Sequence, residues 1–314
     1  MNKKLVVLGL FALVLVPVIV AIAIGNPMST TGKGKGIAFG QGIGLIRVDG
    51  TIMGGTSGAS LLSGSTAGSE DLMEQIKQAR EDDRVKVVLL RINSPGGSVP
   101  ATQEVGDELE KLKKAGKKVV VSMGDVAASG GYWLAAKADR IVANPGTMTG
   151  SIGVIMETQN MQELYKKVGI TPQVIKSGQF KDIGSSNRPM TEQERQLLQA
   201  MVNDMYNQFV DVVAKGRKMD PAQVRKIADG RILTGRQAKS LGLVDDIGNY
   251  YDAIEIAKKM VGIKGEVELI EYGQKSPFAE MFGGISKSAV KLLLGDLNSS
   301  NGARLVEEYS QRVR

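Results

Sequence analysis

The feature that most constrains the fold of this chain is a repeated alternation of apolar strand patterns and amphipathic helix patterns. Residues 43–48 alternate like a strand, and residues 70–80 place apolar side chains at helical spacing. Residues 85–92 form a continuous apolar run, which is typical of a buried parallel strand. A helix pattern at 101–115 and a strand pattern at 118–123 follow. This alternation predicts an α/β fold with a mostly parallel sheet flanked by helices.

Two turns made of small residues follow buried strand patterns directly. Residues 93–97 read Asn-Ser-Pro-Gly-Gly, and residues 124–132 read Gly-Asp-Val-Ala-Ala-Ser-Gly-Gly-Tyr. Loops at the carboxyl ends of parallel strands carry the chemistry of such sheets, so we expect the two turns to share a cleft. Ser129 lies at a turn between a predicted strand and the start of the next predicted helix. This is the arrangement of a nucleophile elbow, although the G-x-S-x-G spacing is absent. The alternative interpretation of Ser129 is an ordinary helix N-cap.

The absence of two residue types restricts the base that could activate Ser129. The chain contains no histidine and no cysteine, so a Ser-His-Asp arrangement and cysteine-based routes are closed to a site built from this chain. Lysine is the natural remaining candidate, because burial in an apolar pocket lowers its pKa from about 10.4 toward roughly 7 to 8. If Ser129 is catalytic, we expect its partner to be a lysine. The same absences exclude disulfides and Cys/His zinc sites.

The charge balance argues against a nucleic-acid partner. Lys and Arg total 40 against 33 Asp and Glu, a net charge of +7. The basic residues are dispersed and aromatic residues are few, which is unlike a nucleic-acid platform. The excess of positive charge suits an anionic membrane surface or ordinary solubility.

The N-terminus predicts a membrane anchor. Residues 5–24 are uncharged and mostly apolar, and Lys3 and Lys4 precede them. A run of this length spans a hydrocarbon core of about 30 Å as a helix. The preceding positive charges predict a cytoplasmic N-terminus, with the rest of the chain outside. The alternative is a cleaved signal peptide with a cleavage site at 21–23, although secretory apolar regions run to only about 7 to 15 residues.

Two strand patterns precede a loop that contains two candidate lysines. The strand patterns lie at 152–156 and 171–175, and residues 176–182 read Lys-Ser-Gly-Gln-Phe-Lys-Asp. Lys176 and Lys181 are both candidates for the base of a serine nucleophile. The alternative interpretation is that both are solvated surface lysines, as most lysines are.

Helix patterns dominate the rest of the chain. Residues 191–194 form a capping box that begins a long amphipathic helix, which is expected to end near Gly216. Further patterns predict three helices and a last strand, at 221–228, 234–241, 245–261 and 267–270.

Four motifs occur together in a fixed order. They read Asn-Ser-Pro-Gly-Gly at 93–97, Ala-Ser-Gly-Gly-Tyr at 128–132, Thr-Gly-Ser-Ile-Gly at 149–153, and the lysine loop at 176–182. Over residues from about 43 to 251, their order and separation resemble the short, half-length form of the signal peptide peptidase A family. The resemblance implies a Clp protease/crotonase-like fold. It also implies a serine protease with a Ser-Lys dyad that degrades remnant signal peptides after their release from preproteins, with no cofactor and no metal.

The resemblance also implies roles for individual residues. Ser129 is expected to be the nucleophile and Lys181 the base, with Lys176 as the fallback. Ser151 matches the residue that orients the lysine amine through its hydroxyl, and its alternative interpretation is a simple turn residue.

An oxyanion hole needs two preorganised N–H donors. The N–H of Gly130 adjoins the nucleophile, and the N–H of Gly97 can approach because glycine lacks a Cβ atom. Gly96 is the weaker alternative to Gly97. A tight turn alone also explains these glycines.

The expected organisation has four parts. They are an anchor at 1–24, a flexible linker at 25–42, a Clp protease/crotonase-like serine protease domain at 43–272 and a C-terminal tail at 273–314. Full-length relatives carry two copies of the domain, with serine and lysine in different halves. We therefore expect a single-pass membrane homo-oligomer with extracytoplasmic sites at its subunit interfaces, acting on signal peptides and other unfolded peptides.

Three other interpretations remain. A crotonase-like acyl-CoA enzyme has the same fold, although the anchor places the domain away from cytosolic CoA. A membrane serine protease that partners a stomatin-like scaffold usually has further membrane spans, and no second long apolar run occurs in the sequence. The third is a catalytically inactive binding or scaffold protein.

Overall fold

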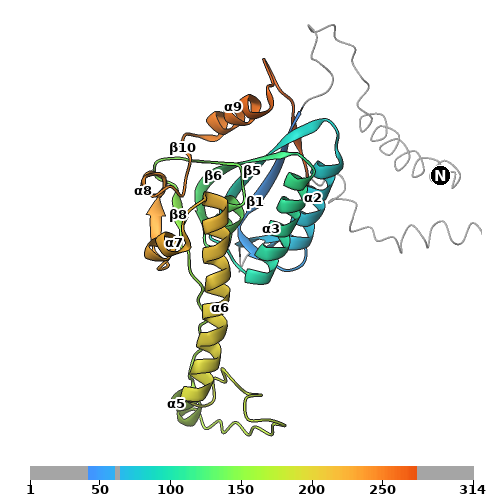
Figure 1. Cartoon of the computed structure of the whole chain (residues 1–314). Helices are drawn as coiled ribbons and strands as arrows, with labels where there is room; N and C mark the ends of the chain where they lie inside the picture. Colours follow the sequence, from blue (N-terminus) through green and yellow to red (C-terminus); the bar gives the residue numbers. More distant parts are fainter. Residues whose placement is uncertain (1–41, 61–63, 274–314) are drawn as a thin grey trace, which may run out of the picture. The chain divides into compact units, whose positions relative to one another are not determined.

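A mostly parallel sheet lies at the centre of the computed structural model, which describes residues 42–60 and 64–273 (Figure 1). Its strands are β1 (Gly42–Asp49), β5 (Val85–Ser94), β6 (Lys118–Ala128), β7 (Arg140–Ala143), β8 (Met148–Gly150), β9 (Ile232–Thr234), β10 (Asp246–Ile247) and β11 (Leu269–Glu271). The strand order is β10-β7-β6-β5-β1-β11, and β8 pairs with β6 and β9. The pair of β8 and β9 is antiparallel, and the other pairs are parallel. The predicted α/β fold with a mostly parallel sheet is confirmed.

Helices accompany the sheet throughout the described chain. They are α2 (Ser69–Glu81), α3 (Val99–Lys114), α4 (Gly130–Ala136), α5 (Gln162–Lys167), α6 (Glu192–Arg217), α7 (Pro221–Ile227), α8 (Gly235–Ser240) and α9 (Tyr250–Val261). Figure 1 shows α2 and α3 side by side, with α9 on the other side of the sheet. None of the helices in the described ranges is long and apolar enough to cross a membrane. The predicted anchor at 1–24 lies outside those ranges, as do nearly all of the linker and the tail.

Both faces of the sheet are buried, which explains its continuous apolar strands. Successive side chains on a strand point to opposite faces. Leu90 of β5 accordingly belongs to the larger hydrophobic cluster, which contains Leu109 of α3. Its neighbour Leu89 belongs to a second cluster, which contains Ala253 and Ala257 of α9. The strands of the sheet are therefore held by a core on each side.

Residues 153–208, which we call the arm, contrast with this core. Glu194 is the one buried residue in this stretch. The capping box of Thr191 and Glu194 begins α6 as the sequence predicts. The C-terminal half of α6 packs on the sheet region, where the ring of Phe209 lies 5.0 Å from that of Trp133. Apart from Glu194, the residues of the arm are exposed or half-buried. Figure 1 shows the N-terminal half of α6 and α5 extending away from the sheet.

Two predicted strands in this region are wrong. Residues 152–156 and 171–175 are not strands in the structure, although Ile155 and Ile175 carry the apolar side chains that suggest them. Both isoleucines are exposed, and a strand needs a neighbour for its backbone hydrogen bonds. No such ladder forms with the rest of the described chain.

Other differences are small or concern short elements. The helix predicted at 245–261 begins at Tyr250, because residues 246–247 form β10 instead. The sequence analysis also misses a small second sheet of β2 (Thr51–Met53), β3 (Gly58–Ser60) and β4 (Gly64–Gly68). These strands are too short to show a period in the sequence. The middle residue of β2 nevertheless contacts the candidate site.

Candidate active site

The ends of two neighbouring parallel strands bring Ser129 and Ser151 together. In the register of β6 and β8, Ala128 lies opposite Gly150, so the two serines occupy the next positions on strands about 4.8 Å apart. The N–H of Ser129 donates to the carbonyl oxygen of Gly150 at 2.9 Å. Both serines line one cavity of about 500 Å³. Two of the sequence-predicted site residues therefore share a cavity.

The backbone of Ser129 adopts an unusual conformation. Its φ is 51° and its ψ is −121°, outside the regions that L-residues ordinarily occupy. Such strain persists where the surrounding structure enforces it, and it concentrates at functional sites. Ser129 occupies the N-cap position of α4, but its side chain makes no capping hydrogen bond. The interpretation as an ordinary N-cap is therefore wrong, and the half-buried hydroxyl remains available to another group.

The two glycine-containing turns are in close contact, although residues 93–97 do not line the cavity that contains Ser129. A Cβ atom built on Gly96 would lie 2.6 Å from the nitrogen of Gly130 and 2.7 Å from the Cβ of Ser129. A Cβ atom on Gly97 would lie 2.0 Å from the carbonyl oxygen of Ile52 in β2. Only glycine fits these contacts without moving the backbone. The Asn-Ser-Pro-Gly-Gly turn is thus wedged between β2 and the turn that holds Ser129.

The backbone N–H groups of the glycines differ in their partners. The N–H of Gly96 donates to the Oγ of Ser94 at 3.1 Å. The N–H groups of Gly97 and Gly130 have no hydrogen-bond partner within the described ranges. The nitrogen of Gly97 lies 3.4 Å from where a Cβ of Gly130 would stand, so the two N–H groups are neighbours. Two unsatisfied donors beside a serine hydroxyl can bind an oxyanion.

Neither candidate lysine lines the cavity that contains the two serines. The cavity is lined by Ser129, Ser151, Gly153, Val154, Ile155, Val202, Asn203, Tyr206, Ala228, Asp229 and Gly230. Lys176 and Lys181 both lie in the arm and are exposed. The Nζ of Lys176 pairs with Asp182 at 2.7 Å and donates to the carbonyl oxygen of Gln179 at 3.0 Å. The side chain of Lys181 has no polar partner in the parts of the chain that the structure describes.

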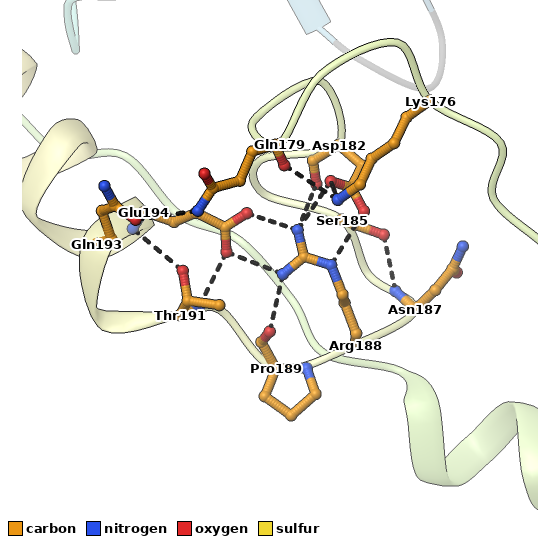
Figure 2. Close-up of polar contacts among 10 residues, drawn as sticks. All are labelled: Lys176, Gln179, Asp182, Ser185, Asn187, Arg188, Pro189, Thr191, Gln193 and Glu194. Atoms are coloured by element: carbon orange, nitrogen blue, oxygen red, sulfur yellow. Dashed lines mark hydrogen bonds and ion pairs between the residues drawn. The ribbon is translucent and has the colours of Figure 1, made fainter.

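An ion cluster holds the loop that contains the two lysines (Figure 2). Arg188 lies between the carboxylates of Asp182 and Glu194. Hydrogen bonds from Arg188 and Lys176 hold the pKa of Asp182 well below its usual range. Hydrogen bonds from Arg188 and from the N–H of Thr191 lower the pKa of Glu194 to about 2. The sequence analysis misses Arg188, because side-chain pairing across a loop leaves no periodic signal.

Two protein-family models match the part of the chain that contains the candidate site. The model of peptidase family S49 matches residues 111–264, which include Ser129, Ser151 and both candidate lysines. The model described as Clp protease matches residues 63–150, which include the glycine turn and Ser129. The two matches overlap at the strand end that holds Ser129.

Several curated proteins are similar over most of this chain. A putative protease of Synechocystis sp. is 42% identical over 232 residues, which are 73% of this chain and 79% of that protein. A putative signal peptide peptidase SppA of Enterococcus faecium is 40% identical over 70% of this chain and 64% of its own length. Protease 4 of Salmonella typhi is 39% identical over 72% of this chain, but the match spans 35% of that protein.

Proposed function

Because the chain belongs to peptidase family S49 and is a serine protease, we propose that it cleaves peptide bonds with a dyad of Ser129 and Lys181. The observation that carries the proposal is the strained turn of Ser129, whose uncapped hydroxyl lies beside the unsatisfied N–H groups of Gly97 and Gly130. This combination supplies a nucleophile and an oxyanion hole on one rigid support.

The proposed reaction has two halves. The Oγ of Ser129 attacks the scissile carbonyl carbon while the neutral amine of Lys181 takes the hydroxyl proton, and the N–H groups of Gly97 and Gly130 bind the oxyanion. Lys181 then gives the proton to the leaving amine nitrogen as the peptide bond breaks. A water molecule attacks the acyl-enzyme with Lys181 again as the base, and Ser129 is regenerated. The hydroxyl of Ser151 accepts a hydrogen bond from the lysine amine and orients it.

The contacts of the two lysines favour Lys181 over Lys176 as the base. A general base must spend part of its time as a neutral amine. The Nζ of Lys176 is occupied by the ion pair with Asp182 and by the carbonyl oxygen of Gln179. Lys181 has no such partner within the described ranges, so its amine is available to another surface. This contrast supports the assignment that the resemblance implies.

We further propose that Lys181 reaches Ser129 of a neighbouring copy of the chain. The cavity that contains Ser129 has no lysine in its lining, so one chain supplies an incomplete site. The arm also exposes nine of the fifteen large apolar side chains that are exposed in the described ranges: Ile155, Met156, Leu164, Val168, Ile170, Val174, Ile175, Leu197 and Met201. Exposed apolar surface on this scale is typical of an interaction surface. Symmetric association would bury it and complete each site with the neighbour's lysine.

The proposed substrates are remnant signal peptides and other unfolded peptides. One relative carries the name signal peptide peptidase. The cavity beside Ser129 contains Val154, Ile155 and Val202, which suit the apolar side chains of such peptides. The predicted anchor at 1–24 and linker at 25–42 would hold the protease domain (43–272) at the extracytoplasmic face, where these peptides leave the bilayer. The tail at 273–314 has no assigned role in this scheme.

A serine-directed fluorophosphonate probe tests the chemistry. We expect one covalent adduct on the detergent-solubilised protein, which peptide mapping locates at Ser129. Ser129→Ala should prevent labelling, and Lys181→Ala should slow it strongly because the hydroxyl loses its base. Labelling at another serine, or unchanged labelling of Lys181→Ala, would contradict the proposed dyad.

A further inference from the structure

Arg188 lies at the centre of the ion cluster in the arm, and its five N–H donors all have partners (Figure 2). Toward Asp182, its Nε donates to Oδ2 at 3.0 Å and its Nη2 to Oδ1 at 2.9 Å. Toward Glu194, its Nη1 donates to Oε2 at 2.8 Å and its Nη2 to Oε1. The remaining Nη1 hydrogen reaches the carbonyl oxygen of Pro189 at 3.1 Å. A guanidinium fork can grip two carboxylates in this way, and an ammonium cannot.

One of the two carboxylates is fixed to a rigid element. Glu194 is the third residue of α6, and the N–H of Thr191 donates to its Oε2 at 2.9 Å. In return, the N–H of Glu194 donates to the Oγ1 of Thr191 at 3.2 Å. Glu194 is only 2% exposed, in an arm whose other residues are not buried. Its carboxylate is therefore a fixed point at the N-terminus of the long helix.

The other carboxylate belongs to the residue that follows Lys181. Asp182 receives two hydrogen bonds from Arg188 and one from Lys176. The adjoining backbone is tightened by turn hydrogen bonds, from the N–H of Lys181 to Gly178 at 3.2 Å and from Ser185 to Asp182 at 3.0 Å. The loop from Lys176 to Lys181 buries no side chain that could hold it by packing. The ion cluster thus ties this loop to α6, together with one hydrogen bond from the Nε2 of Gln179 to the Oε1 of Gln193 at 3.0 Å.

We propose that Arg188 is a positioning residue, which clamps Asp182 to Glu194 and thereby fixes the backbone from which Lys181 extends. The inference rests on the proposed role of Lys181 as the base. The clamp removes freedom from the loop before the lysine meets Ser129, and a misplacement of about 1 Å can cost a reaction roughly 100-fold. It also compensates the negative charge of Asp182, the residue that follows Lys181 in the chain.

Arg188→Ala tests the clamp in the full-length, assembled protein with a peptide substrate. We expect kcat to fall about 100-fold, with KM changed far less, because the loss falls on the placement of the base. In this variant Asp182 keeps its ion pair with Lys176 but loses both hydrogen bonds from Arg188, so less of its negative charge is compensated. This charge lies next to Lys181 in the chain and should favour the ammonium of Lys181, so the acidic limb of kcat/KM should move to higher pH. Arg188→Lys keeps one charge without the fork, and we expect a smaller loss.

Arg195→Ala is the matched control. Arg195 is an exposed arginine of α6, and it pairs weakly with Glu192 at 3.9 Å. Within the described ranges its side chain forms no hydrogen bond or ion pair with Asp182 or Glu194, so kcat and the pH profile should match those of the parent protein. Lys181→Ala is measured beside these variants. An active Lys181→Ala protein would overturn the proposed base itself, whatever Arg188 does.

With an inactive Lys181→Ala protein, three results would overturn the clamp alone. The first is an Arg188→Ala protein whose kcat, and whose acidic limb of kcat/KM, both equal those of the parent protein. The second is a lower melting temperature with unchanged kinetics, which would make Arg188 a stabilising residue only. The third is loss of the oligomer on size exclusion, which would make it an assembly residue. If Arg188→Ala does not fold, Asp182→Asn replaces it: a large fall in kcat supports the clamp, and the parent kcat overturns it.

Discussion

Ser129 and Lys181 lie in two regions of the chain that are held by different forces. The turn of Ser129 joins β6 to α4, a helix in which every residue is buried. Lys181 lies in an arm whose one buried residue is Glu194. Hydrophobic burial on both faces stabilises the sheet region, whereas ion pairs and turn hydrogen bonds hold the loop of the arm. The difference teaches that packing within one chain fixes the proposed nucleophile and oxyanion donors, while the proposed base would depend on the proposed clamp and on a neighbouring subunit.

The largest expected effect is the loss of the nucleophile from the rigid region. Ser129→Ala should lower peptide hydrolysis by at least about 1,000-fold without unfolding the protein, because the hydroxyl caps nothing in the fold. Ser122→Ala is the matched control, since Ser122 is a buried serine in β6, the strand that leads to Ser129. Peptide hydrolysis and circular dichroism measure the two properties. Hydrolysis by Ser129→Ala within tenfold of the parent rate would refute the assignment.

The next largest effect concerns the charge of the base in the arm. Lys181→Arg should be as inactive as Lys181→Ala, because a guanidinium does not deprotonate in the working range. Lys176→Arg should retain activity, because an arginine can preserve the ion pair with Asp182. The parent kcat/KM should rise toward neutral or mildly alkaline pH as the lysine loses its proton. Activity in Lys181→Arg combined with inactivity in Lys176→Arg would reverse the two roles.

A third experiment asks whether the two regions meet within one chain or between chains. Inactive Ser129→Ala and Lys181→Ala proteins are mixed in equal amounts under conditions that allow subunit exchange. If serine and lysine come from different copies, about a quarter of the sites regain both parent residues, and activity should return to that fraction. Exchange is verified independently with labelled subunits. Persistent inactivity after proven exchange would place the dyad within a single subunit.

A further prediction concerns the close contact of Gly96 with the turn that holds Ser129, in the rigid region. Gly96→Ala places a Cβ atom 2.6 Å from the nitrogen of Gly130, at a residue whose φ is 101°. We expect kcat to fall about 100-fold, as for the loss of one oxyanion donor, because the neighbouring N–H groups must move apart. Gly116→Ala is a control at another positive φ, where a Cβ atom would meet nothing within 4 Å. Equal activities of the two variants would show that the close contact at Gly96 is not needed to place the N–H groups.

The smallest expected effect is a loss of local stability in the arm at acidic pH. Folding lowers the pKa of Glu194 from 4.5 to about 2, so the stability that this carboxylate contributes is present above about pH 4.5 and is lost as the pH falls toward 2. Asp182 contributes in the same direction. Hydrogen exchange, corrected for intrinsic rates, should therefore show the loop at 176–190 opening in this range before β5 and β6 do. Glu194→Gln should open the loop already at neutral pH, and simultaneous opening of the loop and the sheet would contradict the comparison.

Much of the rigid region is predictable from its sequence. The strand patterns at 85–92 and 118–123 lie within β5 and β6, as predicted. These elements follow from local patterns, because burial on a sheet face or at a helix end imposes a period on the chain. The arm is less predictable: residues 171–175 have a strand pattern but no strand partner within the described chain. The apolar residues there indicate burial without indicating what covers them.

The sequence by itself determined the alternation of strands and helices, the places of the two glycine turns, and the exclusion of histidine and cysteine from the chemistry. Only the tertiary structure decided that the N–H of Gly96 is occupied while those of Gly97 and Gly130 are not. It also decided that Ser129 caps nothing and that Arg188 joins Asp182 to Glu194. The physical reason is that residue types and periods are local properties of a chain. Hydrogen-bond partners depend on strand register and on how loops close, which no single segment specifies.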